Sequence, residues 1–179
     1  MNKDKVQQII KEVALLLPKI ESQVSNINNG GCGVFAYLMW KRLLELGVET
    51  VKAWPIIYDD STPDEVNTAF LNISEGDDPL NIKCNFTHIV LEVELPDGSA
   101  RYLIDSEGID EVPYVTDGMQ VEGHFVDDLE PDASRFGESL TYDLLRKLAL
   151  DTRQGLWDPE FDREDIPTIE YMLKRIQPV

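Results

Sequence analysis

Cys32 is the residue in this sequence best suited to covalent chemistry. It lies in the segment 28–38, where glycines lead into a dense apolar run that ends at Gly47. This pattern predicts that Cys32 occupies the first turn of a buried helix, where unpaired backbone N–H groups and the helix dipole stabilise a thiolate. A thiolate is a nucleophile, so the position favours covalent catalysis. Taken alone, however, a cysteine in an apolar run is more often a small buried side chain.

A histidine and an aspartate lie on either side of a predicted hairpin turn. His88 stands in the alternating apolar run 87–95, and Asp105 ends the shorter run 101–105. Such runs are typical of strands, and Pro-Asp-Gly-Ser at 96–99 predicts the turn between them, with Asp-Gly in a type I′ turn. We therefore expect these two strands to pair in antiparallel register.

That register brings polar side chains of the two strands together. In it His88 faces Glu107, and Asp105 lies opposite Val90 on the same face, which makes Asp105 a diagonal neighbour of His88. A carboxylate orients an imidazole and stabilises its protonated form, which favours a thiolate–imidazolium pair with a nearby cysteine. We expect Cys32 as nucleophile, His88 as base and acid, and Asp105 as orienting carboxylate. Glu107 is the alternative orienter, and a register shift of one residue would move Asp105 to the opposite face.

These motifs together resemble the papain-like and transglutaminase-like superfamily, whose members include arylamine N-acetyltransferases and bacteriocin-processing cysteine peptidases. The resemblance covers residues 28–108 and rests on Gly-Gly-Cys-Gly at 30–33, Thr-His-Ile-Val at 87–90 and Tyr-Leu-Ile-Asp-Ser-Glu-Gly at 102–108. The order Cys, His, Asp and the short gap from His88 to Asp105 are more similar to the transglutaminase-like branch than to papain, whose third residue is Asn. The resemblance implies a cysteine hydrolase or acyltransferase that acts on an amide or peptide bond through a thioester, without a cofactor.

The resemblance also implies an oxyanion donor upstream of the cysteine, often a Gln or an Asn. Four side chains compete for this role: Gln23, Asn26, Asn28 and Asn29. Asn26 is preferred because it precedes Cys32 by the separation seen in papain-like enzymes. The backbone N–H of Cys32 itself is the alternative donor.

The pattern of apolar residues predicts an α+β fold in a single domain over residues 1–179. Two N-terminal helices come first, the second a central helix that starts at the cysteine and packs on an antiparallel sheet, and C-terminal helices follow. Pro18 is expected to stop the first helix, residues 59–85 are an acidic loop insertion, and 138–179 form a helical extension. The expected helices are 3–17, 32–46, a short one around 64–71, 139–151 and 165–176, and the expected strands are 51–58, 87–95, 101–105, 112–115 and 123–126.

The charge of the chain limits the classes of partner. The sequence has 34 acidic and 16 basic residues, for a net charge of −18. This charge argues against nucleic acid and against an anionic membrane surface, whereas a basic protein, peptide or small amide substrate suits it. High acidity is nevertheless often only a solubility feature. A non-catalytic acidic binding or inhibitor protein on the same fold, of the kind a phage encodes, is therefore the alternative function, and the oligomeric state is not predicted.

Neither a metal site nor a membrane segment is predicted. Cys84 and His88 have a C-x-x-x-H spacing, but the further ligands of a zinc site are missing, and His124 has no hairpin partner. No apolar run reaches the length of a membrane-spanning helix. With no export signal, the two cysteines are expected to be free thiols in the cytoplasm, of the producing cell or of a host.

Overall fold

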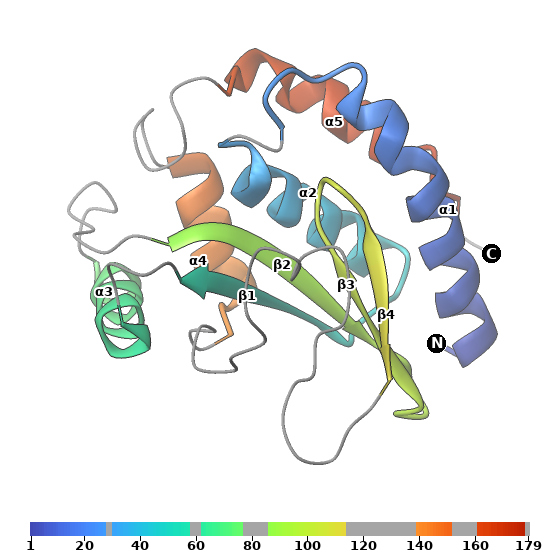
Figure 1. Cartoon of the computed structure of the whole chain (residues 1–179), viewed down its shortest axis with the longest axis horizontal. Helices are drawn as coiled ribbons and strands as arrows, with labels where there is room; N and C mark the ends of the chain where they lie inside the picture. The colour runs from blue at the N-terminus through green and yellow to red at the C-terminus, as the bar shows by residue number, and fades with distance from the viewer. Residues whose placement is uncertain (28–29, 58–61, 77–85, 114–138, 152–160, 178–179) are drawn as a thin grey trace.

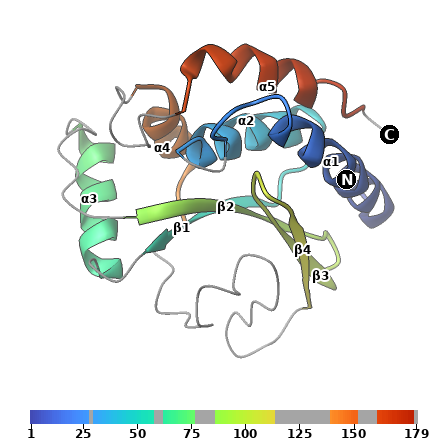
Figure 2. The ribbon, with the colours of Figure 1, turned by 45° about the horizontal axis from the view of Figure 1, so that its top comes forward.

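A central helix, α2, crosses one face of a four-stranded antiparallel sheet (Figure 1). The computed structural model describes residues 1–27, 30–57, 62–76, 86–113, 139–151 and 161–177. Helices α1, α2 and α5 lie on the same side of the sheet (Figure 2). The expected α+β class, with a central helix that begins at Cys32 and packs on an antiparallel sheet, is confirmed.

The described elements run from an N-terminal helix pair through the sheet to a C-terminal helical region. The helices are α1 Lys3–Glu21, α2 Cys32–Glu45, α3 Pro63–Glu75, α4 Tyr142–Arg146, the π-helix η3 Lys147–Asp151, the 3-10 helix η4 Arg163–Asp165 and α5 Ile166–Leu173. The strands are β1 Val51–Ile57, β2 Phe86–Glu94, β3 Ala100–Ile104 and β4 Ile109–Pro113, and they lie in the order β1-β2-β3-β4. The expected strand 123–126 lies outside the described residues.

Helix α1 continues past the proline that was expected to stop it. Pro18 stands inside the helix, which ends at Glu21 and not near Pro18 as predicted. A proline this near the C-terminus removes one intrahelical hydrogen bond. The apolar stripe continues beyond it, because Ile20 is fully buried one turn after Leu16 and Leu17. Burial of Ile20 in the core offsets the lost bond and keeps the last turn helical.

Helix α2 is the centre of the core. All its residues from Cys32 to Trp40 are buried, as is Leu43. A helix that is apolar on most faces must be covered on most faces, and the sheet and the C-terminal helices α4, η3 and α5 supply much of that cover. The helix ends before Gly47, whose φ of 84° is a left-handed conformation that glycine adopts at little cost. The expected helix over 32–46 is therefore confirmed.

Strands β2 and β3 pair in the predicted register, but through a different turn. Leu91 faces Ile104, and Glu94 faces Arg101. The connection is a four-residue loop, because the N–H of Leu95 bonds to the carbonyl of Ala100 at 2.9 Å. The expected type I′ turn is wrong, since it needs a positive φ at both Asp97 and Gly98, and among the described non-glycine residues only Asn26 has one.

The reason for the different turn lies in the residue before Asp97. Pro96 has a φ fixed near −65°, which suits the second position of a type I turn over 95–98. The N–H of Gly98 closes that turn on the carbonyl of Leu95 at 2.8 Å, with φ of 67° at Gly98. The same strand register is thus compatible with both turns.

Both faces of β2 are buried, although its sequence alternates. Ile89, Leu91 and Val93 lie in the main core, as expected, but Val90 and Glu92 on the other face are also buried. Glu92 is a buried acidic residue, and two basic side chains lie close to its carboxylate. Lys52 and Arg101, at 3.8 and 3.5 Å from its two oxygens, make burial of its charge tolerable.

Helix α3, Pro63–Glu75, takes up about half of the expected acidic loop 59–85. Thr62 and Glu65 form a capping box, in which each side chain accepts a hydrogen bond from the other's backbone N–H, and the proline at the start suits the first turn. The expected short helix around 64–71 is confirmed and extends to Glu75. The prediction that 59–85 form mainly a loop is therefore wrong for 63–75, and 58–61 and 77–85 lie outside the described residues.

The C-terminal region starts with a bridge to the sheet. Leu140 pairs with Ala53 on the outer edge of β1, and its N–H donates to the Ala53 carbonyl at 2.8 Å. Helix α4 then begins at Tyr142, capped by the Thr141 side chain, and passes into the π-helix η3. The expected helix 139–151 therefore begins later than predicted. Of the expected helix 165–176, α5 occupies Ile166–Leu173.

No helix in the described ranges combines the length and the apolar character needed to cross a bilayer.

Candidate functional site

Cys32 is the first residue of α2, as the sequence predicted. Cys32 is only 3% exposed, and its thiol is free. The first bond at this end of α2 runs from the N–H of Phe35 to the carbonyl of Gly31 at 2.9 Å. The N–H groups of residues 32–34 therefore have no partner within the helix, and α2 has no acidic side chain in its first turn to oppose a thiolate.

Gly31 is needed at the position before the cysteine because the chain is crowded there. A methyl group on Gly31 would lie 2.7 Å from the carbonyl oxygen of Ile27 and 2.7 Å from Cδ2 of Phe161. Its φ of −89° is ordinary, so close approach and not backbone conformation demands glycine. The space beside Gly31 is thus filled by Ile27, from the turn after α1, and by the ring of Phe161 from the C-terminal region.

His88 lies where β2 has lost its ladder partner on the β3 side. The described pairing of the two strands ends at Leu91 and Ile104, while β2 still pairs with β1 at His88. The turn between β3 and β4 approaches α2 in both views (Figure 1 and Figure 2). The imidazole is 20% exposed, and its Nε2 lies 2.7 Å from Oδ2 of Asp105.

The thiol of Cys32 lies close enough to the imidazole of His88 to raise its pKa. Since Nε2 faces Asp105, Nδ1 is the ring nitrogen left for the sulfur. Burial acts to lower the pKa of His88, but the hydrogen bonds to Asp105 and Cys32, with the negative charge of both groups, outweigh it and raise the pKa from 6.5 to about 10. The geometry therefore favours an imidazolium between two acidic groups.

Asp105 is held by the turn that it begins. It is 1% exposed, and its Oδ1 accepts hydrogen bonds from the N–H groups of Glu107 and Gly108 at 2.7 and 2.9 Å. Its own N–H donates to the Gly108 carbonyl at 3.1 Å, which closes a tight hairpin with Ser106 and Glu107 at its tip. One carboxylate oxygen thus builds the turn, and the other receives the imidazole.

The structure brings together three of the predicted site residues: Cys32, His88 and Asp105. The predicted diagonal contact between His88 and Asp105 is present. Glu107, the alternative orienter, has an exposed side chain and contributes its backbone N–H to Asp105 instead. Asp105 therefore holds the position next to the imidazole.

The predicted oxyanion donor Asn26 lies in the turn after α1. It is exposed and has a φ of 56°, a left-handed conformation in which asparagine is enriched. Gln23 is exposed in the same turn region, and Asn28 and Asn29 lie outside the described residues. An oxyanion role for Asn26 stays a prediction, while the backbone N–H of Cys32 is available at the helix start.

Cys84 and His124, which the sequence did not favour as site residues, lie outside the described residues. Within the described part of the chain, no group of three or more His, Cys, Asp or Glu side chains is arranged to hold a metal ion.

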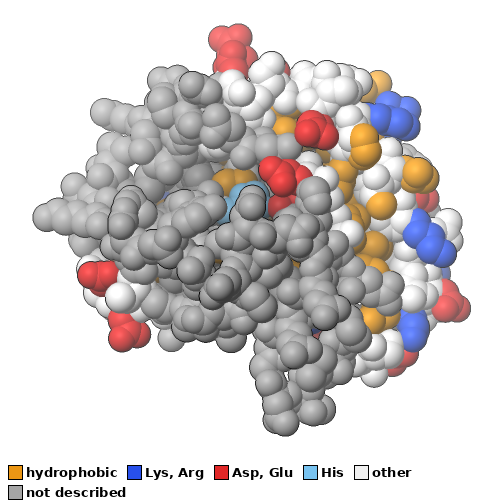
Figure 3. Space-filling view, viewed as in Figure 1, with side chains coloured by type: hydrophobic (Ala, Val, Ile, Leu, Met, Phe, Trp, Pro, Cys, Tyr) orange, Lys and Arg blue, Asp and Glu red, His pale blue; other side chains and the backbone are white. Residues whose placement is uncertain are grey.

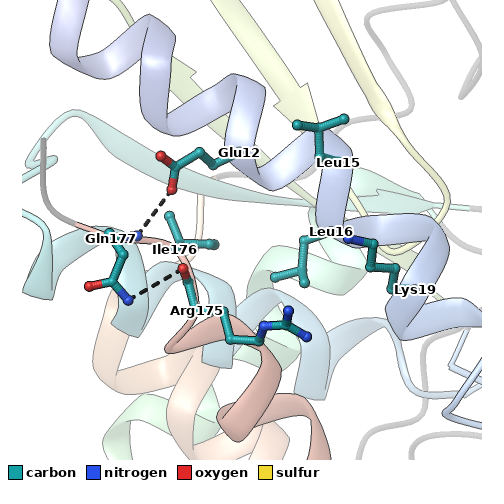
Figure 4. Close-up of a pocket in the computed structure, with 7 residues that line it drawn as sticks. All are labelled: Glu12, Leu15, Leu16, Lys19, Arg175, Ile176 and Gln177. Atoms are coloured by element: carbon teal, nitrogen blue, oxygen red, sulfur yellow. Dashed lines mark hydrogen bonds between the residues drawn. The ribbon is translucent and has the colours of Figure 1, made fainter.

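On the face seen in Figure 1, a histidine side chain reaches the surface next to acidic side chains (Figure 3). A hollow of about 280 Å³ lies elsewhere, between α1 and the segment after α5 (Figure 4).

Sequence reasoning missed two contributors to this site. The N–H groups that fix Asp105 had a signal, since aspartate at the first and glycine at the fourth position of Asp-Ser-Glu-Gly are typical of a type I turn. Phe161 against Gly31 had none, because the two residues are far apart in the sequence and no periodicity links them.

Comparisons of the chain with models of protein families, with curated proteins and with solved structures find no match.

Proposed function

We propose that this protein is a cysteine-dependent hydrolase or acyltransferase that acts on an amide or peptide bond through a thioester. The observation that carries the proposal is the position of His88, which hydrogen-bonds to Asp105 through Nε2 and lies close enough to the thiol of Cys32 for that group to raise its pKa. A nucleophile, a base and a group that orients the base are the parts such a reaction requires. The order of the three residues and the helix that begins at Cys32 support a papain-like or transglutaminase-like domain.

In the first step, the Cys32 thiolate attacks the carbonyl carbon of the amide. The carbonyl electrons move to oxygen, and the N–H of Cys32 is placed to stabilise the negative charge because it has no intrahelical partner. The imidazolium of His88 then donates its proton to the amide nitrogen. The C–N bond breaks, the amine leaves, and the acyl group remains on sulfur as a thioester.

In the second step, the now neutral His88 accepts a proton from the acyl acceptor. Water as acceptor gives a carboxylic acid and regenerates the thiol, whereas an amine gives a new amide. Peptidase, amidase, deamidase and transglutaminase reactions share the thioester and differ only in the leaving group and in this acceptor. Asp105, fixed by two backbone N–H groups, keeps the imidazole in one orientation through both steps.

The charge of the chain supports a basic protein, peptide or small amide as substrate. A net charge of −18 produces a field that attracts cations and repels nucleic acid. Because the chemistry needs a free thiol, a reducing compartment such as the cytoplasm of the producing cell or of a host suits it. No cofactor enters any of the steps above.

The reactivity of Cys32 tests the proposal without knowledge of the substrate. In a Cys84→Ser background, one thiol remains, and its alkylation by iodoacetamide can be followed by mass spectrometry across pH. We expect native Cys32 to react faster at neutral pH than the same thiol in urea-unfolded protein, because the imidazolium of His88 and the start of α2 favour a reactive sulfur. His88→Ala should remove this advantage, because the imidazolium partner is lost.

The stability of Cys32→Ala supplies the control. We expect its free energy of unfolding to stay close to that of the parent protein, since the thiol acts as a nucleophile and fills little volume. A large loss of stability, combined with native Cys32 that is no more reactive than the unfolded thiol, would overturn the proposal. That result would favour the non-catalytic acidic binding or inhibitor protein instead.

A further inference from the structure

We infer that Phe161, in the C-terminal extension, is a positioning residue for the nucleophile. This inference rests on the proposed function and extends its machinery beyond the segment that contains Cys32, His88 and Asp105. Phe161 is 3% exposed and belongs to the core cluster. Its ring approaches the residue directly before Cys32 so closely that a single methyl group there would lie 2.7 Å from Cδ2.

The contact falls on the peptide that matters most to the chemistry. Gly31 is the N-cap residue of α2, and its peptide with Cys32 carries the N–H that is available to an oxyanion. The carbonyl oxygen of Ile27 lies 2.7 Å from the same methyl position, so Phe161 and Ile27 together fill the space beside Gly31 where a side chain would lie. Close packing at this point supports the backbone of Gly31, and the direction of the Cys32 N–H and side chain depends on the dihedral angles of that backbone.

Phe161 is itself anchored by its neighbours in the sequence. The side chain of Asp162 caps η4 by accepting from the N–H of Glu164 at 2.9 Å. The guanidinium of Arg163 donates to the carbonyl of Ala149 in the π-helix η3. The elements that precede and follow Phe161 in the sequence, η3 and α5, both contact the central helix α2.

This arrangement predicts that Phe161 influences reactivity and not only stability. A catalytic group displaced by about 1 Å loses roughly two orders of magnitude in rate. Removing the ring gives Gly31 room to move and should misalign the thiol from His88. The helix start would then no longer present sulfur and N–H in the geometry that the thioester chemistry requires.

The test compares Phe161→Ala with Leu173→Ala in the Cys84→Ser background. Leu173 is 2% exposed on α5, so both changes remove a buried apolar side chain from the C-terminal region, but Leu173 does not touch Gly31 in the described contacts. The readouts are the pH profile of Cys32 alkylation under native conditions and the titration of His88 by NMR. We expect Phe161→Ala to lower the alkylation rate near neutral pH by roughly tenfold or more and to lower the pKa of His88.

Leu173→Ala should lower the unfolding temperature but leave both profiles unchanged. Phe161→Leu, which keeps an apolar side chain and folds more readily, should fall between the parent and Phe161→Ala in alkylation rate. Parent-like profiles in both Phe161 variants, or an equal loss in Leu173→Ala, would overturn the inference while leaving the proposed function intact. A parent Cys32 that reacts no faster than the unfolded thiol would overturn both together.

Discussion

Two hairpin turns of the sheet each use an aspartate in the same way, and only one of them belongs to the candidate site. Asp97, between β2 and β3, accepts from the N–H and the hydroxyl of Ser99 with Oδ1 and faces Lys3 with Oδ2 at 3.1 Å. Asp105, between β3 and β4, accepts from two backbone N–H groups with Oδ1 and faces His88 with Oδ2. Each carboxylate thus builds a turn with one oxygen and meets a cationic partner with the other.

The two turns differ in their exposure to water. The side chain of Asp97 is 49% exposed, whereas Asp105 is 1% exposed. The ion pair between Asp97 and Lys3 is exposed to water, which screens it, so it contributes little to stability. In the interior, Asp105 and Cys32 together raise the pKa of His88 to about 10. Burial therefore turns an ordinary turn-forming carboxylate into a group that sets the charge of an imidazole.

Replacement of the buried aspartate by alanine should break the comparison most strongly. Asp105→Ala leaves the N–H groups of Glu107 and Gly108 and the imidazole of His88 without their acceptor in a buried place. We expect a loss of about 3 kcal/mol in the free energy of unfolding, measured by urea denaturation, and loss of the enhanced alkylation of Cys32. A loss as small as that of the matching Asp97→Ala change would show that burial does not separate the two turns.

Replacement by asparagine should separate the two uses of the buried side chain. Asp105→Asn keeps an Oδ1 acceptor for the turn but offers His88 an amide in place of a charge. We expect only about 1 kcal/mol loss of stability, together with a marked fall in the alkylation rate of Cys32 because the imidazolium is no longer supported. Equal losses of stability in the asparagine and alanine variants would mean that the turn bonds contribute little.

Titration of His88 should show the buried partner's effect directly. Its raised pKa means that the stabilisation is fully present below pH 6.5 and is lost as pH rises through about 10. In Cys32→Ala one of the two groups that raise this pKa is removed, so the total loss of stability should be smaller and should be complete at a lower pH. NMR titration, in which the only other histidine is His124, and unfolding measurements over the same pH range check both statements.

The exposed turn should respond least. Hydrogen bonds from the Ser99 hydroxyl and N–H, and then the ammonium of Lys3, lower the pKa of Asp97 from 3.8 to about 2. Its contribution is therefore present above pH 3.8 and is lost as pH falls through about 2. At neutral pH we expect Asp97→Ala to change the unfolding temperature by no more than about 2 °C and to leave Cys32 alkylation unchanged. A larger change in the unfolding temperature that does not depend on salt concentration would contradict the explanation that water screens the Asp97–Lys3 pair.

Period-two alternation and the turn residues were enough to predict how His88 and Asp105 meet. The register of β2 and β3 was predicted from a two-residue turn at Asp97-Gly98, and it is confirmed although the turn type is wrong, because a four-residue loop centred on the same residues gives the same pairing. The start of α2 at Cys32 followed from glycines before an apolar run. The strand register and the start of α2 depend on residues that are neighbours in the sequence, so they can be predicted from one sequence alone.

Other features depend on residues distant in the sequence and could not be predicted. Pro18 is tolerated inside α1 because Ile20 finds a place in a core built largely from later segments. Glu92 is buried because Lys52 and Arg101 arrive from the neighbouring strands. Phe161 and Gly31 are separated in the sequence by the whole sheet and α4, so no local pattern predicts their contact.

The bridge between Leu140 and Ala53 also bears on how this acidic protein avoids association through its sheet. Ala53 has its carbonyl on the open edge of β1, and Leu140 occupies it. Alternate residues of a strand present their backbone groups to the same side, so the nitrogen of Pro55, which carries no hydrogen, faces that edge too. A strand from a second copy would thus find one acceptor taken and one donor missing. A variant truncated before Leu140 would lack this cover, and the exposed edge of β1 could then pair with a strand of another molecule.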